Sequence, residues 1–136
     1  LDFQRARREF GPPAKARRQS GEESLVSDRN ITVQDLTPVE VAKGIEEGRY
    51  LLIDVREPNE VAIEAYPDAV VLPLSTFDPS DIPDLQGREL VFACRSGNRS
   101  AKISHAIQAA GFPYDKHLAG GMIAWKAAGL PIRTGG

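Results

Sequence analysis

The chain has 136 residues, of which 41% are hydrophobic, and this is typical of one globular domain that buries its own core. Its single cysteine excludes an internal disulfide and favours a reducing compartment such as the cytoplasm, and no apolar run approaches the roughly 18 residues that cross a bilayer. Residues 1–18 carry a net charge of +4 within a chain of net charge −2, so the remainder carries −6, which argues against nucleic-acid binding by the folded part.

The first 28 residues are polar, contain few large apolar side chains and are interrupted by a Gly-Pro-Pro sequence. This composition predicts a basic, mostly disordered tail over residues 1–28. Its arginines also fit a transit peptide or an RNA-contacting arm, although three glutamates argue against a transit peptide. We therefore expect the folded domain to span residues 29–136.

The start of this domain follows a strand–helix–strand order. Residues 31–33 alternate like a short edge strand. Thr37 and Pro38 then begin a helix with a capping box, and Gly48 ends it. Residues 50–53 form a continuous apolar run, as expected of a parallel strand buried on both faces. The order predicts an α/β sheet whose ligands bind beyond the carboxyl ends of the strands.

Asp54 lies at such a carboxyl end, directly after the second strand. It can serve the ligand site, or it can be a turn residue before the proline that follows, which is a common role for aspartate. We expect a short helical segment over residues 58–65 and a strand over residues 69–72. A proline-punctuated connection over residues 77–85 then leads to the next strand.

Cys94 follows an apolar strand at residues 90–92 and precedes a helix that Gly111 ends. A strand that turns directly into a helix leaves backbone N–H groups unpaired at the positive end of the helix dipole. We expect the amides of residues 95–99 to surround the Cys94 sulfur and to lower its pKa. The alternative is an inert small hydrophobe at a strand end. The flanking arginines argue against it, because inert buried cysteines have apolar surroundings.

Two arginines in this loop require negative partners. Arg99 lies in the first helical turn, where a cation opposes the dipole, so a carboxylate or an anionic substrate must compensate it, and Arg95 raises the same question. If the strands before Asp54 and Cys94 are neighbours, Asp54 can reach Arg99. Four residues separate Cys94 from Arg99, one fewer than in phosphatases with a cysteine cradle. The tighter ring suits a single sulfur atom better than a tetrahedral phosphate.

The segment after this helix contains further candidates. His105 and His117 could act as bases for a cysteine nucleophile. A thiol activated by a helix dipole needs no partner base, however, and one histidine makes no metal site, so we expect structural or surface roles for both and no metal centre. Gly120 and Gly121 allow the backbone to pass close to the cysteine loop, and Trp125 is expected in the core.

The sequence Cys-Arg-Ser-Gly-Asn-Arg-Ser at residues 94–100 resembles the active-site loop of single-domain rhodaneses, the thiosulfate sulfurtransferases. Three further segments agree with the family in the same order, at residues 52–58, 71–74 and 118–125. The resemblance covers roughly residues 31–132. One departure lies outside the cysteine loop, since the chain has Glu-Ala-Tyr-Pro-Asp-Ala where the family usually has Gly-His-Ile-Pro-Gly-Ala.

The resemblance implies a three-layer α/β fold, with a mostly parallel central sheet of about five strands and helices on both faces. It implies an enzyme that moves sulfane sulfur from thiosulfate to a thiophilic acceptor through a persulfide on Cys94, without a cofactor. Asp54 and Arg56 would shape the wall of the active site as supporting residues. The substrate-binding loop would consist of Arg95, Ser96, Gly97, Asn98 and Arg99.

Two alternatives remain open at this point. The domain could be a non-catalytic sulfur-carrier or docking module, or it could perform phosphatase or arsenate-reductase chemistry on the same fold. The short loop argues against a phosphatase, and the absence of a second cysteine argues against a self-contained arsenate reductase. We expect a cytoplasmic monomer whose partners are a small sulfur donor such as thiosulfate and an acceptor thiol, cyanide or protein.

Overall fold

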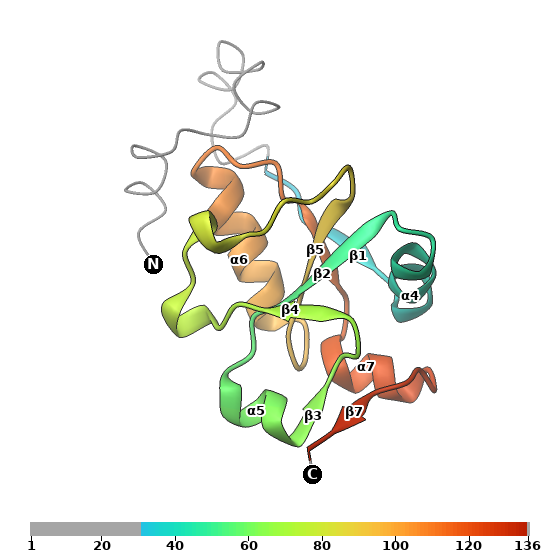
Figure 1. Ribbon diagram of the computed structural model, residues 1–136. Coiled ribbons are helices and arrows are strands. Elements are labelled where there is room, and N and C mark those ends of the chain that lie inside the picture. The colour runs from blue at the N-terminus through green and yellow to red at the C-terminus, as the bar shows by residue number, and fades with distance from the viewer. Residues whose placement is uncertain (1–30, 136) are drawn as a thin grey trace.

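The computed structural model describes residues 31–135, and the tail predicted over residues 1–28 lies outside this range. None of the helices in the described part is long and apolar enough to cross a membrane. In chain order the elements are β1 (Gln34–Leu36), α4 (Pro38–Glu46), β2 (Tyr50–Asp54), α5 (Pro58–Ile63), β3 (Glu64–Ala65), β4 (Ala69–Val71), η2 (Leu74–Thr76), η3 (Pro79–Asp81), β5 (Glu89–Ala93), α6 (Asn98–Ala109), β6 (Lys116–Leu118), α7 (Gly121–Ala127) and β7 (Arg133–Thr134) (Figure 1).

Five strands form the central sheet in the order β1-β6-β5-β2-β4, and every neighbouring pair is parallel. Strands β5 and β2 therefore lie inside the sheet, as their continuous apolar sequences predict. A separate antiparallel pair joins β3 to β7. The carboxyl ends of β2 and β5 lie side by side, with Asp54 in register with Ala93, the residue before Cys94.

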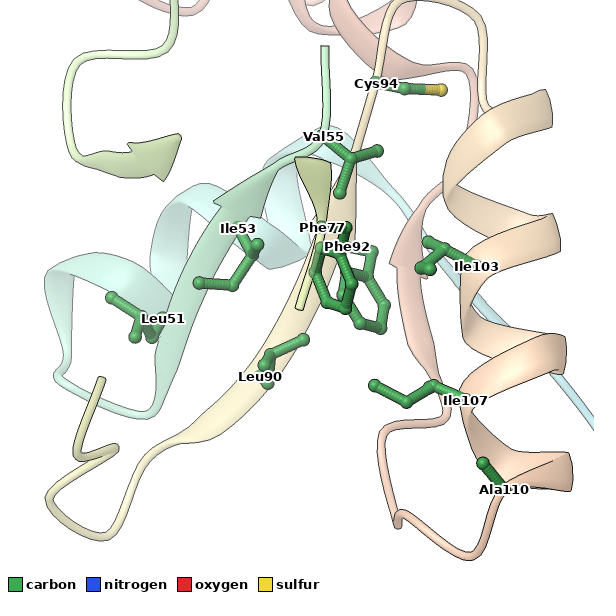
Figure 2. Close-up of a cluster of buried hydrophobic side chains, with 10 residues drawn as sticks. All are labelled: Leu51, Ile53, Val55, Phe77, Leu90, Phe92, Cys94, Ile103, Ile107 and Ala110. Atoms are coloured by element: carbon green, nitrogen blue, oxygen red, sulfur yellow. The ribbon is translucent and has the colours of Figure 1, made fainter. Parts of the chain in front are cut away.

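Helices cover both faces of the sheet, which confirms the predicted three-layer α/β fold. Successive residues of a strand point to opposite faces, so Leu51 and Ile53 pack toward α6 whereas Leu52 packs with α4 and α7 on the other side. Figure 2 shows the α6 side, where side chains of β2 and β5 meet Ile103 and Ile107. Each face thus has its own apolar core.

The helix after β1 begins as its sequence predicts. The Thr37 hydroxyl accepts the Glu40 N–H at 3.2 Å, and the Glu40 carboxylate accepts the Thr37 N–H at 3.0 Å, which completes the capping box. Val41, a residue of this helix, is fully buried. The capping box and the buried side chains of α4 together position this helix against β2.

Two predicted elements differ from the structure by more than one residue at an end. The first strand begins at Gln34, whereas the alternation placed it at residues 31–33, because its partner β6 pairs Gln34 with Lys116. The helix expected to reach residue 65 ends at Ile63, because residues 64 and 65 pair with β7 as strand β3. In both cases a distant partner decides where the strand lies.

Candidate active site

Cys94 lies at the carboxyl end of β5, in a four-residue turn that leads into α6. The turn closes at Gly97, whose φ of 98° is a left-handed conformation that favours glycine. The Gly97 N–H donates to the Cys94 Sγ at 3.1 Å, and the Ser100 N–H donates to it at 3.4 Å. Gly97 lies in the predicted range of amide donors. Ser100 lies one residue beyond it, where a first-turn N–H has no partner within the helix.

The sulfur of Cys94 is fully buried. One side of it meets the apolar cluster of the α6 face, and Figure 2 shows Cys94 at the end of that cluster, beyond Val55. Burial is the largest single influence and raises the pKa of Cys94. The Ser100 hydroxyl, together with the amides of Ser100, Gly97 and Ser96, outweighs burial and brings the pKa below its ordinary value. The site therefore favours a thiolate despite its apolar side.

The remaining side chains of the loop point in different directions. Those of Arg95, Ser96 and Asn98 are exposed, so they face incoming molecules and do not support the loop. Arg99 is half-buried. Of residues 95–99, only the backbone therefore donates to the sulfur, while the exposed side chain of Arg95 places a cation outside the loop.

The predicted pairing of Asp54 with Arg99 is wrong. Asp54 is buried and binds Arg56, whose Nη2 lies 2.8 Å from Oδ2 and whose Nε lies 3.0 Å from Oδ1. The Arg56 N–H also donates to the same carboxylate at 3.0 Å. An arginine two residues away needs no tertiary arrangement to reach Asp54, so the local pair forms. The pair lies between the end of β2 and the start of α5.

The carboxylate that compensates Arg99 is Glu60, in the first turn of α5. The Arg99 Nη1 and Nη2 donate to the two Glu60 oxygens at 2.6 and 2.8 Å. Hydrogen bonds from Arg99, stronger than the opposing effect of burial, lower the pKa of Glu60 to about 2. Sequence reasoning required a partner for Arg99 but had no signal for one 39 residues away.

Replacing Glu60 by glutamine should remove this pair and destabilise the fold by about 1 kcal/mol near neutral pH, because the pair is partly solvated. A lowered carboxyl pKa stabilises the fold above the unfolded value of 4.5, and this contribution disappears as pH falls toward about 2. The difference between wild type and Glu60→Gln in urea unfolding should therefore shrink over that range.

Glu64→Gln is the matched control for this experiment. It breaks the more exposed pair with Lys126, so it should reduce stability less and without the same pH dependence. Equal losses of stability in Glu60→Gln and Glu64→Gln at every pH would contradict the predicted pH-dependent contribution of the Glu60–Arg99 pair.

Helix α7 hydrogen-bonds to the backbone of the cysteine loop. The N–H groups of Met122 and Ile123 donate to the carbonyls of Cys94 and Arg95, each at 3.0 Å. A Cβ at Gly121 would lie 2.5 Å from the Arg95 carbonyl group, so glycine is required for this approach, as the sequence predicts. The first turn of α7 thus fixes the loop backbone.

Tyr66 supports the loop from the segment in which the chain departs from the family pattern. Its hydroxyl donates to the Cys94 carbonyl at 2.7 Å, and its ring packs edge-on against Trp125 at 5.3 Å between centroids. The Arg56 guanidinium lies 5.2 Å from the centre of the same ring. Trp125 is buried, as predicted. Tyr66, which lies in the segment that departs from the family pattern, therefore hydrogen-bonds to the backbone of Cys94.

A pocket of about 450 Å³ opens beside the loop. Its charged lining consists of Arg56, Glu60, Glu64, Arg95 and Lys126. Four of these are engaged in ion pairs with Asp54, with Arg99 or with each other. Within residues 31–135, Arg95 forms no ion pair, so its charge is available to an anion that enters the pocket.

The two histidines differ in their surroundings. His105 is exposed on α6. His117 is buried on β6, and its ring nitrogens lie 2.9 Å from the Ser100 hydroxyl and 2.6 Å from an Asp35 oxygen. Within the described part of the chain, no group of three or more His, Cys, Asp or Glu side chains is arranged to hold a metal ion.

Comparison with known proteins gives one consistent family. The model of the rhodanese-like domain matches residues 37–128. An uncharacterized protein of Synechocystis sp. is 39% identical over 102 residues, which are 75% of this chain and 55% of that protein, so the chain spans about half of its length. A sulfurtransferase of Allochromatium vinosum is 40% identical over 84 residues, which are 60% of this chain and 77% of that protein.

The fold agrees with this assignment. The crystal structure of a rhodanese-related protein from Thermoplasma volcanium superposes with a TM-score of 0.63 over 74% of this chain and 97% of that one, at 23% identity. At that identity the likeness shows the fold alone. The matched residues 37–128 contain the cysteine loop, the Asp54–Arg56 pair and the supporting helix α7. The chain therefore belongs to the rhodanese-like domain family.

Proposed function

We propose that this domain is a sulfurtransferase that carries sulfane sulfur as a persulfide on Cys94. The observation that carries the proposal is the pair of amides, from Gly97 and Ser100, that point at the Cys94 sulfur and help to lower its pKa. A thiolate is the form of cysteine that attacks sulfur. Membership of a family with relatives named as sulfurtransferases supports the same reaction.

In the first half-reaction, the Cys94 thiolate attacks the outer sulfur of thiosulfate. A sulfur–sulfur bond forms to Cys94, the bond within thiosulfate breaks, and sulfite leaves with the bonding electron pair. The terminal sulfur of the persulfide then carries the negative charge at the amino end of α6, where unpaired N–H groups favour an anion. Arg95, which has no ion pair within residues 31–135, attracts the dianionic donor to the mouth.

In the second half-reaction, a thiophilic acceptor attacks the terminal sulfur and the Cys94 thiolate leaves. Splitting the transfer into two displacements predicts ping-pong kinetics. The acceptor is cyanide in an assay and a thiol or a protein in the cell. Cys94 is the single cysteine among these 136 residues, so they offer no second thiol to take the sulfur. Arg99, neutralised by Glu60, holds the loop and does not bind the donor directly.

A protein acceptor is favoured by the rim of the pocket. Ile63 and Ile123 line the pocket and are 70% and 55% exposed, respectively. Exposed apolar side chains beside a reactive group are typical of a surface that binds a partner. The carrier or docking alternative uses the same persulfide, so it differs from the first proposal only in the physiological acceptor.

Phosphatase chemistry has less support from the loop. Its amides close on one atom, the Cys94 sulfur, over a turn of four residues. A phosphoryl group needs donors to three oxygens, and Arg99 is already engaged by Glu60. Hydrolysis of a phenyl phosphate by the wild type, and not by a Cys94→Ser variant, would contradict this conclusion.

The proposal predicts a mass increase of one sulfur atom when the intact protein is incubated with thiosulfate. Cys94→Ser should show no increase, because a serine hydroxyl is not ionised and does not form a persulfide. Added cyanide should return the wild type to its original mass and release thiocyanate. Mass spectrometry of the whole chain measures each step. A wild type that gains no sulfur, or a gain that survives in Cys94→Ser, would overturn the proposal.

A further inference from the structure

A continuous series of side-chain contacts leads from the Cys94 sulfur to the surface. The Cys94 Sγ lies 3.5 Å from the Ser100 Oγ, which lies 2.9 Å from Nδ1 of His117. The other ring nitrogen, Nε2, lies 2.6 Å from Oδ1 of Asp35. Asp35 lies in β1, His117 in β6 and Ser100 in α6, and Cys94 directly follows β5, so only the folded sheet brings the four side chains together (Figure 1).

The register of the sheet explains this placement. His117 pairs with Asp35 of β1 on one side and with Phe92 of β5 on the other. Paired residues of parallel strands point to the same face, and Cys94 follows Phe92 by two residues, so all of them face α6. Ser100, in the first turn of α6, stands between His117 and the sulfur.

Burial decreases along the series. Cys94 and Ser100 are fully buried, and the side chain of His117 is 6% exposed, whereas that of Asp35 is 74% exposed. The sulfur thus has no direct contact with water, but the far end of the series does. A proton that leaves the thiol must pass through the protein, and this series provides a route.

The hydrogen inventory of these groups allows two arrangements. The Asp35 carboxylate can only accept, so Nε2 of His117 carries a proton. When the ring is neutral, Nδ1 accepts the Ser100 hydroxyl proton and the thiol donates to the Ser100 Oγ. When the ring is positively charged, Nδ1–H donates to the Ser100 Oγ and the hydroxyl donates to the thiolate. The Gly97 carbonyl, at 3.2 Å, is a longer alternative acceptor for this hydroxyl.

We propose that His117 is the positioning residue that takes up the Cys94 thiol proton through Ser100. The thiol proton moves to the Ser100 Oγ while the hydroxyl proton moves to His117 Nδ1. The products are a thiolate and an imidazolium, and the total charge and the number of protons are unchanged. The proposal rests on the proposed function in one respect. A sulfurtransferase needs the thiolate, and this proton transfer supplies it.

The other charged groups near β6 either have ion-pair partners of their own or are exposed. On β6, on its neighbouring strands β1 and β5 and on α6, the charged and titratable groups besides His117 are Asp35, Glu89, Arg99, Lys102, His105 and Lys116, and Cys94 follows β5. Lys116 binds Glu89, Arg99 binds Glu60, and Lys102 and His105 are exposed. The ring of His117 therefore contacts the carboxylate of Asp35 directly and the sulfur of Cys94 through one hydroxyl.

The test measures the thiolate of Cys94 by its far-ultraviolet absorbance as pH is raised, with Cys94→Ser as the blank. His117→Asn keeps an amide that can hydrogen-bond to Ser100 but cannot accept a proton. It should raise the apparent thiol pKa by about one unit, because the neighbouring positive charge is lost. Asp35→Asn should shift it in the same direction by less. His105→Asn, on the exposed face of α6, is the matched control and should leave it unchanged.

Two further measurements separate a proton role from a structural one. In a Ser100→Ala background, His117→Asn should cause a smaller additional shift, since the proton route through the hydroxyl is already lost and only the charge of the ring remains. Over the pH range in which the thiolate first forms, nitrogen NMR should find both ring nitrogens of His117 protonated in the wild type, and only one in Cys94→Ser. The NMR result stands even if His117→Asn fails to fold.

An unchanged thiol titration in His117→Asn, or a ring whose protonation is the same in wild type and Cys94→Ser, would overturn the proposal. Neither measurement uses a sulfur donor. Failure here would therefore leave the persulfide chemistry intact, and failure of the persulfide test would leave this proton transfer intact.

Discussion

Gly121→Ala should destabilise the protein by about 2–4 kcal/mol and abolish sulfur transfer. A Cβ on Gly121 would lie 2.5 Å from the carbonyl carbon and oxygen of Arg95 and 2.6 Å from the Cys94 oxygen. All of these are backbone atoms that cannot rotate away, and a φ of 56° adds strain for any residue with a side chain. The methyl group must push the cysteine loop away from α7, and the hydrogen bonds from Met122 and Ile123 would then break.

Urea unfolding and the rate of persulfide formation measure the two effects. Gly129→Ala is the matched control, because Gly129 has a φ of 75° but no atom within 4 Å of its added Cβ. It should lose only about 1 kcal/mol, the cost of the backbone conformation, and keep full activity. Equal losses of stability in Gly121→Ala and Gly129→Ala would show that the close contact between α7 and the cysteine loop adds nothing to the cost of the substitution.

Asp54→Ala should cost about 3–5 kcal/mol, because it leaves the buried guanidinium of Arg56 without its carboxylate. Asp54 and Arg56 are 0% and 2% exposed, so water cannot replace the lost bonds. The loss should appear as a lower urea midpoint with an unchanged dependence on urea concentration. Because Arg56 also lines the pocket, donor binding should weaken as well.

The double variant Asp54→Leu with Arg56→Met provides the control for this prediction. It removes both charges and fills the space with apolar groups of similar size, so it should recover most of the stability that Asp54→Ala loses. A double variant as unstable as Asp54→Ala would show that packing around these side chains, and not the unpaired charge, causes the loss.

The sequence was sufficient for those parts of the site that depend on neighbouring residues. The turn at Cys94 follows from a strand, a glycine and a helix in immediate succession, so its amides could be predicted to face the sulfur. The close approach of α7 followed from Gly121 in the same way. These features need no knowledge of the rest of the chain.

The pairings across the site could not be predicted, because they depend on how distant elements pack. Glu60 reaches Arg99 only because the first turns of α5 and α6 lie together, and no local pattern distinguishes it from the other glutamates. Strand β6 is three residues long and left no recognisable alternation, so the register that brings His117 to Ser100 was not visible. The short strands β3 and β7 were missed for the same reason.

The complete enclosure of the Cys94 sulfur also restricts the shape of any molecule that reacts with it. Because water does not reach the sulfur, the loop must open before a donor can react, and an atom that projects on a narrow stem, such as the outer sulfur of thiosulfate, requires the smallest opening. The sulfurs of a bulky disulfide are flanked by substituents on both sides and are kept at a distance. Burial, which opposes ionisation of Cys94, is therefore also expected to favour reaction with a terminal sulfur over exchange with a disulfide.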